Sequence, residues 1–248
     1  HTALYSVGGS HAAKVFHLLL ALLLLLQLHR TAERELDKSS ALVAVLLLVG
    51  SYSVLREIGL AYNNLSTALL CLLALDNALQ DRPGRMAVFS GMALAAKYTA
   101  APVLVGIYLA WLWSSRACSW LSLIKWTAIA GLFVAPWWIR NAFSGVHPLF
   151  PYAGWEETTS PFMWPVKYGM GRGMSDFLSL PWNITMHGDP ESFVFLGRVS
   201  PGGLLLLPVA LLWGFPKHRG LAIAASVAFI GWAAGPHWMR YLLPAAPI

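Results

Sequence analysis

The chain has 248 residues, of which 57% are hydrophobic and 11% are charged, and its formal net charge is +6. Its mean hydropathy is +0.59. Soluble domains carry about 25% charged residues, so the composition excludes an ordinary soluble enzyme, and two cysteines are too few for a disulfide scaffold. We interpret the sequence as an all-α polytopic membrane protein with a single transmembrane domain over residues 1–248. Because it begins with His1 rather than methionine, we expect it to be a fragment of a longer chain.

Eight apolar windows without a charged residue are the candidate membrane segments. In chain order they cover residues 15–28, 39–55, 58–75, 86–96, 98–115, 126–139, 199–216 and 220–239. A helix needs about 20 residues to cross a hydrocarbon core of ~30 Å, and flanking Lys and Arg side chains extend the shorter windows to the interface. Lys97 separates the fourth window from the fifth, which favours two short helices meeting there over two full crossings. The pattern predicts a helical bundle with about eight membrane segments.

Basic residues predict the orientation of these segments. Nine of the seventeen Lys and Arg residues fall in one alternating set of short connections: Arg30, Arg34, Lys38, Arg82, Arg85, Arg116, Lys125, Lys217 and Arg219. Short loops rich in Lys and Arg face the cytoplasm, so the long loop over residues 140–198 is expected outside a bacterial inner membrane. Within that loop, the apolar stretch 177–180 predicts a structured cap or an interfacial helix. Because the net charge follows from topology, no nucleic-acid partner is predicted.

Polar residues at membrane depth are costly and are therefore candidate functional residues. They gather on the predicted outer side: Arg56, Glu57, Tyr62, Asn63 and Asn64 in the turn after the second segment, Lys97 and Tyr98 at the broken helix, Arg140, Asn141 and His147 opening the long loop, and His237, Arg240 and Tyr241 after the last segment. Lys97, Arg140 and Arg240 together can bind a phosphate or diphosphate, such as that of a lipid-linked substrate. The alternative is that Arg140 and Arg240 are interfacial anchors beside tryptophans.

Other polar residues favour structural roles. Asp76 is better explained as a carboxylate satisfied by neighbours than as a catalytic group. The spacing of His11, His17 and His29 matches no metal-ligand pattern, which favours packing or interfacial roles. The glycine-rich run 169–173 follows no strand, and a flexible loop explains it better than a phosphate cradle.

Four segments resemble one family in its own order. APWWIRN at 135–141, continuing as GVHPLFP at 145–151, resembles the PWYLRN…TGNPVYPF stretch of bacterial GT-C glycosyltransferases, the group of protein O-mannosyltransferases and aminoarabinose transferases. RYLLPAAP at 240–247 is similar to its RYLLPALP segment, and GMALAAKYT at 91–99 to its GLALGTKYT segment. LPWNIT at 180–185 is similar to the loop that follows in the family.

The resemblance implies a GT-C-like bundle that transfers a sugar from a polyprenyl-phosphate donor to an acceptor on the extracytoplasmic side. The family's base is an acidic residue in its first outer loop, which would lie before His1 here, so no catalytic residue is assigned in this chain. Lys97, Arg140 and Arg240 would contact the donor phosphate. The remaining predicted substrate-binding residues are Glu57, Asn64, Tyr98, Asn141 and Tyr241. No metal ligand is assigned, and a divalent metal is left open as a cofactor.

One departure from the family motivates a second hypothesis. The family's AYVD pattern is AYNN at 61–64, so Asn64 stands where the family has a carboxylate, and an amide cannot take a proton. The chain is then a non-catalytic accessory or scaffold subunit of a larger membrane complex, with other membrane subunits as partners. A transporter is a third reading, since the broken helix at Lys97 permits it, but paired inverted halves are lacking.

Overall fold

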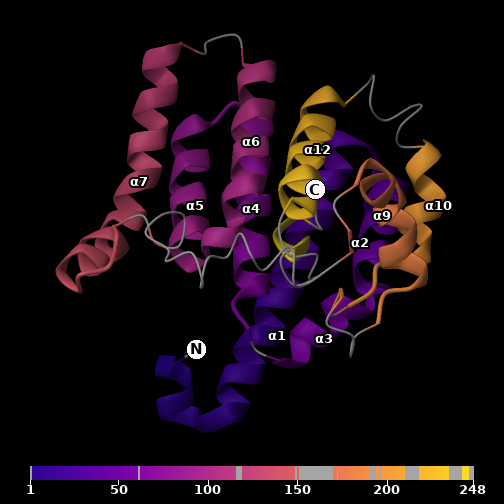
Figure 1. Cartoon of the computed structure of the whole chain (residues 1–248), viewed down its shortest axis with the longest axis horizontal. Helices are drawn as coiled ribbons and strands as arrows, with labels where there is room; N and C mark the ends of the chain where they lie inside the picture. The colour runs from indigo at the N-terminus through magenta and orange to yellow at the C-terminus, as the bar shows by residue number, and fades with distance from the viewer. Residues whose placement is uncertain are drawn as a thin grey trace.

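The computed structural model describes residues 2–60, 62–115, 119–148, 150, 170–171, 173–189, 194–195, 197–209, 218–234 and 242–245. This part of the chain is all-helical (Figure 1). Its helices are α1 (Thr2–Glu35), α2 (Lys38–Val49), α3 (Tyr52–Leu60), α4 (Asn64–Leu79), α5 (Pro83–Ala96), α6 (Ala101–Ser114), α7 (Trp120–Phe143), α9 (Met174–Met186), α10 (Pro201–Val209) and α12 (Arg219–Ala233), with 3-10 turns η1 (Tyr98–Ala100) and η3 (Leu243–Ala245).

Helix α4 is the centre of the bundle. It is apolar on nearly all sides, and such a helix is stable only when neighbours surround it. Leu65, Cys71, Leu72 and Leu75 are all buried to within 1% of complete burial. α1, α5, α6 and η3 pack around it. Figure 1 shows α4 to α7 standing side by side, with α12 next to α6 and α9 and α10 beyond α12.

Two glycines allow close helix packing. A Cβ built on Gly91 of α5 would lie 2.5 Å from the Ala130 carbonyl oxygen of α7. A Cβ on Gly106 of α6 would lie 2.7 Å from the Ala224 carbonyl oxygen of α12. Small residues at such crossings let two backbones approach closely, as in membrane helix pairs. Gly91 belongs to the 91–99 segment on which part of the family resemblance rests.

The bundle has two polar ends, which we name after residues of α4. The Asn64 end holds the start of α4, the end of α5 and the start of α6. The Asp76 end holds the end of α4, the start of α5 and the end of α6. α5 and α6 thus form the hairpin of two short helices that Lys97 predicts, with its turn at the Asn64 end.

The second and third predicted segments are divided differently from the sequence windows. The 39–55 window breaks after Val49, and α2 and α3 are bent by 64° relative to each other. The 58–75 window breaks after Leu60, where α3 ends, and α4 begins at Asn64. The prediction that Arg56 and Glu57 lie in a turn is therefore wrong, since both lie on helix α3. The bend is held by the Ser51 and Ser53 hydroxyls, which donate to the Arg198 carbonyl oxygen at 3.2 and 3.0 Å.

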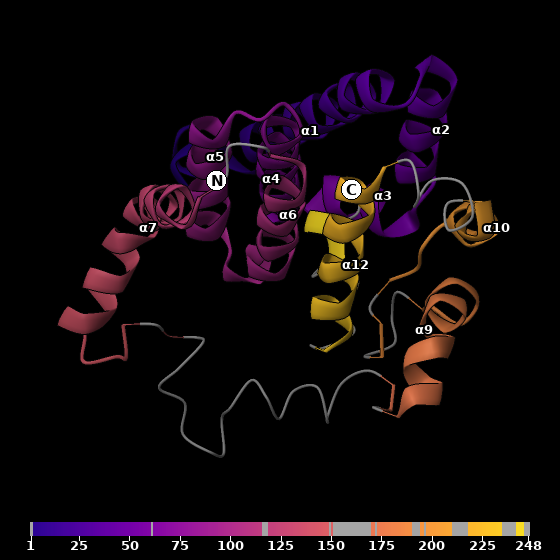
Figure 2. The same ribbon diagram turned by 90° about the horizontal axis from the view of Figure 1, so that it is seen from above.

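The apolar stretch 177–180 of the long loop lies on helix α9, as the sequence predicts. Leu180 and Ile184 of α9 pack with Phe195 and with Trp232 and Ala233 of α12. Figures 1 and 2 show α9 on the side of α12 away from α7. Gly231 of α12 lies against Pro102 at the start of α6, so α9 is attached at the Asn64 end of the bundle.

The exposed surface is apolar enough for a membrane. Residues Gly9–Glu35 of α1 and Trp120–Phe143 of α7 are long and apolar enough to cross one, and the bent pair α2–α3 makes a third such segment if it is one span. Leu19 and Leu22 of α1 and Leu121 and Leu132 of α7 are more than half exposed. Large apolar side chains facing outward on several helices are typical of a membrane surface.

Candidate functional site

Three of the predicted residues meet at the Asn64 end. The Asn64 side-chain amide donates from Nδ2 to Glu57 Oε2 at 2.7 Å, and Lys97 Nζ donates to Asn64 Oδ1. Asn64 is 1% exposed and Glu57 is 5% exposed, whereas Lys97 is half-buried. We call Glu57, Asn64 and Lys97 the polar cluster. Its members come from α3, α4 and the α5–α6 turn, so one buried amide joins a carboxylate to an ammonium across three elements.

Local sequence explains why Lys97 lies here. α5 ends at Ala96, and Lys97 is extended with φ −161° and ψ 122° before the 3-10 turn that leads into α6. Pro102 in the first turn of α6 fits a helix start, since its missing N–H needs no partner there. Asn63 fixes the turn from the other side, because its Nδ2 donates to the Ala96 carbonyl oxygen at 2.8 Å. This hydrogen bond joins the start of α4 to the end of α5.

His17 of α1 contacts the backbone of the α3–α4 connection. It is completely buried. Its Nδ1 lies 3.2 Å from the Ile58 carbonyl oxygen, and its Nε2 contacts the Tyr62 carbonyl oxygen. A carbonyl oxygen only accepts, so the ring nitrogen that carries the proton donates to it. The predicted packing role of His17 is confirmed, and the residue fastens the α3–α4 connection that carries the polar cluster to α1.

Arg140 and Asn141 lie apart from the polar cluster. α7 contains Pro136, which removes a backbone hydrogen bond and bends a helix, and Figures 1 and 2 show the end of α7 turning away from α5. The Arg140 guanidinium lies 4.9 Å from the Trp137 ring centroid, the arrangement expected of an interfacial anchor. Asn141 Nδ2 donates to the carbonyl oxygens of Pro148 and Phe150, each at 3.4 Å, and so holds the start of the long loop.

Three of the predicted substrate-binding residues remain to be placed. Tyr98 is next to the polar cluster in sequence and is 42% exposed. Arg240 and Tyr241 lie outside the described residues. No group of three metal-ligating side chains occurs in the part of the chain that the structure describes, so a divalent metal gains no ligand set there.

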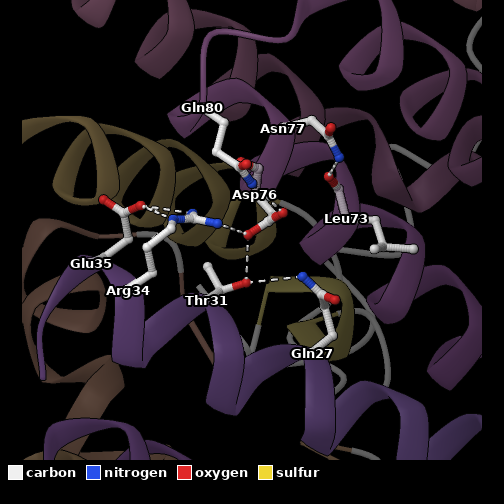
Figure 3. A network of polar contacts seen from close by, with 8 residues as sticks. All are labelled: Gln27, Thr31, Arg34, Glu35, Leu73, Asp76, Asn77 and Gln80. Atoms are coloured by element: carbon white, nitrogen blue, oxygen red, sulfur yellow. Dashed lines mark hydrogen bonds and ion pairs between the residues drawn. The ribbon is translucent and has the colours of Figure 1, made fainter. Parts of the chain in front are cut away.

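A second polar network lies at the Asp76 end (Figure 3). Arg34 Nη1 and Thr31 Oγ1 of α1 donate to Asp76 Oδ1 at 2.6 and 2.9 Å, and Gln80 Nε2 donates to Oδ2 at 2.7 Å. Gln27 Nε2 donates in turn to Thr31 Oγ1 at 3.1 Å. The predicted reading of Asp76 as a satisfied carboxylate is confirmed.

The partners of Asp76 are residues that sequence reasoning missed. Gln27, Thr31 and Arg34 recur at a spacing of four and then three along α1, which places polar side chains on one face of an apolar helix. Polar residues at that spacing predict a helix face that packs against a buried charge.

Searches against protein-family models, curated proteins and solved structures found no match for this chain.

Proposed function

We propose that the chain is a membrane-embedded GT-C-like glycosyltransferase that takes a sugar from a polyprenyl-phosphate donor on the extracytoplasmic side. The observation that carries this proposal is the polar cluster, in which Lys97 and Glu57 are held together at one end of an apolar bundle. A cation beside a buried polar group at membrane depth is a default functional site. The short apolar helices α4, α5, α6 and α12 complete a membrane domain of about eight segments in this proposal.

The distribution of basic residues supports the orientation. Arg34 and Arg82 lie at the Asp76 end. Arg219 lies at the same end, because the neighbouring Gly220 is next to Ser114 and Leu79, the last residues of α6 and α4. We therefore assign the Asp76 end to the cytoplasm of a bacterial inner membrane. The Asn64 end, where α9 of the long loop packs, then faces outward, where a lipid-linked sugar is used.

The proposed chemistry concerns the leaving phosphate. As the bond from the sugar's anomeric carbon to the phosphate oxygen breaks, negative charge develops on that phosphate. A fixed ammonium stabilises this charge better in a site of low dielectric than in water. We assign that role to Lys97, with Glu57, Asn64 and Tyr98 lining the sugar or acceptor. Arg140, Asn141, Arg240 and Tyr241 keep their predicted place around the donor, and the base that activates the acceptor is unassigned.

Donor turnover tests the proposal. The full-length protein in nanodiscs is supplied with undecaprenyl-phosphate hexoses and pentoses, and released undecaprenyl phosphate is measured. We expect turnover by the wild type and at least a tenfold loss in Lys97→Gln, since a charge-assisted hydrogen bond contributes about 1.5–3 kcal/mol. Lys38→Gln, an exposed lysine on α2 at the Asp76 end, is the matched control and keeps full turnover. Equal turnover by Lys97→Gln and the wild type contradicts the assignment.

A second candidate function is favoured by a specific observation. Asn64, which replaces the family's carboxylate, is buried and bridges Glu57 and Lys97, while Arg140 lies against Trp137 instead of the cluster. These contacts suit a non-catalytic accessory subunit that keeps the bundle but not the chemistry. Stable co-purification with other membrane subunits, together with no donor turnover by the wild type, supports this candidate over the enzyme.

A further inference from the structure

A groove at the Asp76 end belongs to neither function. It has a volume of about 500 Å³ and runs between the end of α4 and the start of α5. Its polar lining residues are Asp76, Asn77, Arg82 and Arg85. Asn77 is 5% exposed and donates to the Leu73 carbonyl oxygen at 2.8 Å, so it forms a fixed floor, whereas the two arginines are exposed at the rim.

The acidic groups near the groove are already occupied. Asp76 is paired with Arg34 and accepts further hydrogen bonds from Thr31 and Gln80. Asp81, the acid closest in sequence to the two arginines, accepts from the indole Nε1 of Trp111 at 2.9 Å. Among the described residues, no ion pair involves Arg82 or Arg85. Asp76 is the one carboxylate that the structure shows lining the groove, and because Arg34 pairs with it, no acid in the groove itself balances Arg82 and Arg85.

The backbone adds donors to the same place. Arg82 precedes α5 without capping it by its side chain, and Pro83 fills the first helical position. The first intrahelical bond that closes onto the Arg82 carbonyl oxygen comes from Met86, so the amides of Gly84 and Arg85 precede the regular hydrogen-bond ladder. Gly84 and Arg85 both line the groove. Guanidinium groups and helix N-terminal amides are both suited to phosphate oxygens.

We propose that this groove binds a phosphate group through Arg82 and Arg85, supplied either by the headgroup of an anionic phospholipid or by a soluble phosphate. The proposal does not depend on glycosyl transfer. The groove lies at the end of helices that are apolar along their length, which is the depth of a membrane's headgroups if the bundle spans it.

The test compares two double variants with the same loss of charge. Arg82→Gln/Arg85→Gln removes the groove cations. Arg30→Gln/Arg219→Gln removes two exposed arginines at the same end but outside the groove. Binding of phosphatidylglycerol, phosphatidylcholine and inorganic phosphate to the full-length protein is measured by native mass spectrometry from detergent, and folding of each variant is checked by circular dichroism.

We expect phosphatidylglycerol to bind the wild type and the control, and to bind the groove variant about 30-fold more weakly, because only the groove variant loses charge-assisted hydrogen bonds to the phosphate. Selective binding of inorganic phosphate, lost in the groove variant alone, supports the phosphate site with a soluble ligand. Arg82→Lys/Arg85→Lys is expected to retain part of the affinity, because lysine keeps the charge but not the bidentate geometry. Equal losses in both double variants, or no binding of either phosphate source to the wild type, overturn the proposal.

Discussion

The two polar ends of α4 each hold a buried carboxylate, but in different ways. At the Asp76 end the carboxylate forms a direct ion pair with Arg34 at 2.6 Å and accepts from two neutral donors. At the Asn64 end an amide stands between Glu57 and Lys97, donating to the first and accepting from the second. The first arrangement neutralises the charge of Asp76 by direct pairing. The second joins two opposite charges through a neutral group.

This difference separates a structural site from a candidate functional one. Asp76 joins α1 to α4 in one step, and its side chain is 12% exposed. The polar cluster instead links three elements around a turn, with Lys97 half-buried at its edge. We therefore expect substitutions at the Asp76 end to act mainly on stability and substitutions in the polar cluster to act also on ligand binding.

Asp76→Ala is expected to have the largest effect on stability. It removes the carboxylate that accepts from Arg34, Thr31 and Gln80, and we expect a cost of about 2–3 kcal/mol, since a hydrogen bond to a charged group contributes about 1.5–3 kcal/mol and Arg34 keeps Glu35 as a partner. The free energy of unfolding is measured by SDS titration in mixed micelles. Glu33→Ala removes an acid from the same region whose side chain is 47% exposed, and it is expected to change little. A loss below about 1 kcal/mol in Asp76→Ala shows that the network contributes little.

Asn64→Asp is expected to cost about 2 kcal/mol at pH 8, because two carboxylates then meet where an amide donated to Glu57, and the single Lys97 ammonium balances only one of them. The loss should shrink at pH 5, where a proton shared by the two carboxylates relieves the repulsion, and grow as the pH rises. Asn64→Ala removes the same hydrogen bonds without a new charge. Its loss is expected to differ little between the two pH values, and the same pH dependence in both variants contradicts the bridging role of Asn64.

Asn63→Ala is expected to cost about 1 kcal/mol, since it removes the 2.8 Å hydrogen bond to the Ala96 carbonyl oxygen that ties α4 to α5. Ser66→Ala is the control. Its hydroxyl donates to the Asn63 carbonyl oxygen, which also accepts from the Thr67 hydroxyl and the Thr67 backbone N–H, so two donors remain. Hydrogen exchange at the α5 C-terminus reports the loss locally, and unchanged exchange there in Asn63→Ala rejects this link.

Glu35→Gln is expected to have the smallest effect, below about 0.5 kcal/mol, because the Arg34–Glu35 pair is exposed and Asp76 still holds the guanidinium. The same SDS titration measures it. A loss comparable with that of Asp76→Ala assigns the stabilisation to the exposed pair instead of the buried one.

Composition and charge patterns were sufficient to predict part of this fold. The apolar run after His11 predicts α1, and Lys97 within an apolar stretch predicts the break between α5 and α6, because a charge is costly inside an apolar segment. The bend between α2 and α3 was not predictable. It is held by hydrogen bonds from Ser51 and Ser53 to Arg198, which is 147 residues after Ser51 in the chain. A hydropathy window covers only neighbouring residues, so it gives no sign of a partner so far along the chain.

The candidate site was predictable to a similar extent. Glu57, Asn64 and Lys97 could be selected because polar residues in apolar surroundings are exceptional. Their convergence depends on the α5–α6 hairpin returning Lys97 to the start of α4. The predicted grouping of Arg140 with Lys97 is not seen in the described residues. Pro136 predicts a bend in α7, but its direction cannot be read from the sequence, and the bend turns the end of α7 away from α5.

Binding of undecaprenyl phosphate most directly tests whether the Asn64 end is the functional end. The full-length wild type, Lys97→Gln and Lys38→Gln are placed in nanodiscs, and the Kd for undecaprenyl phosphate is measured for each. The account predicts binding by the wild type and Lys38→Gln, and a Kd roughly tenfold higher or more for Lys97→Gln. The same Kd for all three proteins contradicts the account, because Lys97 then makes no contact with the donor phosphate.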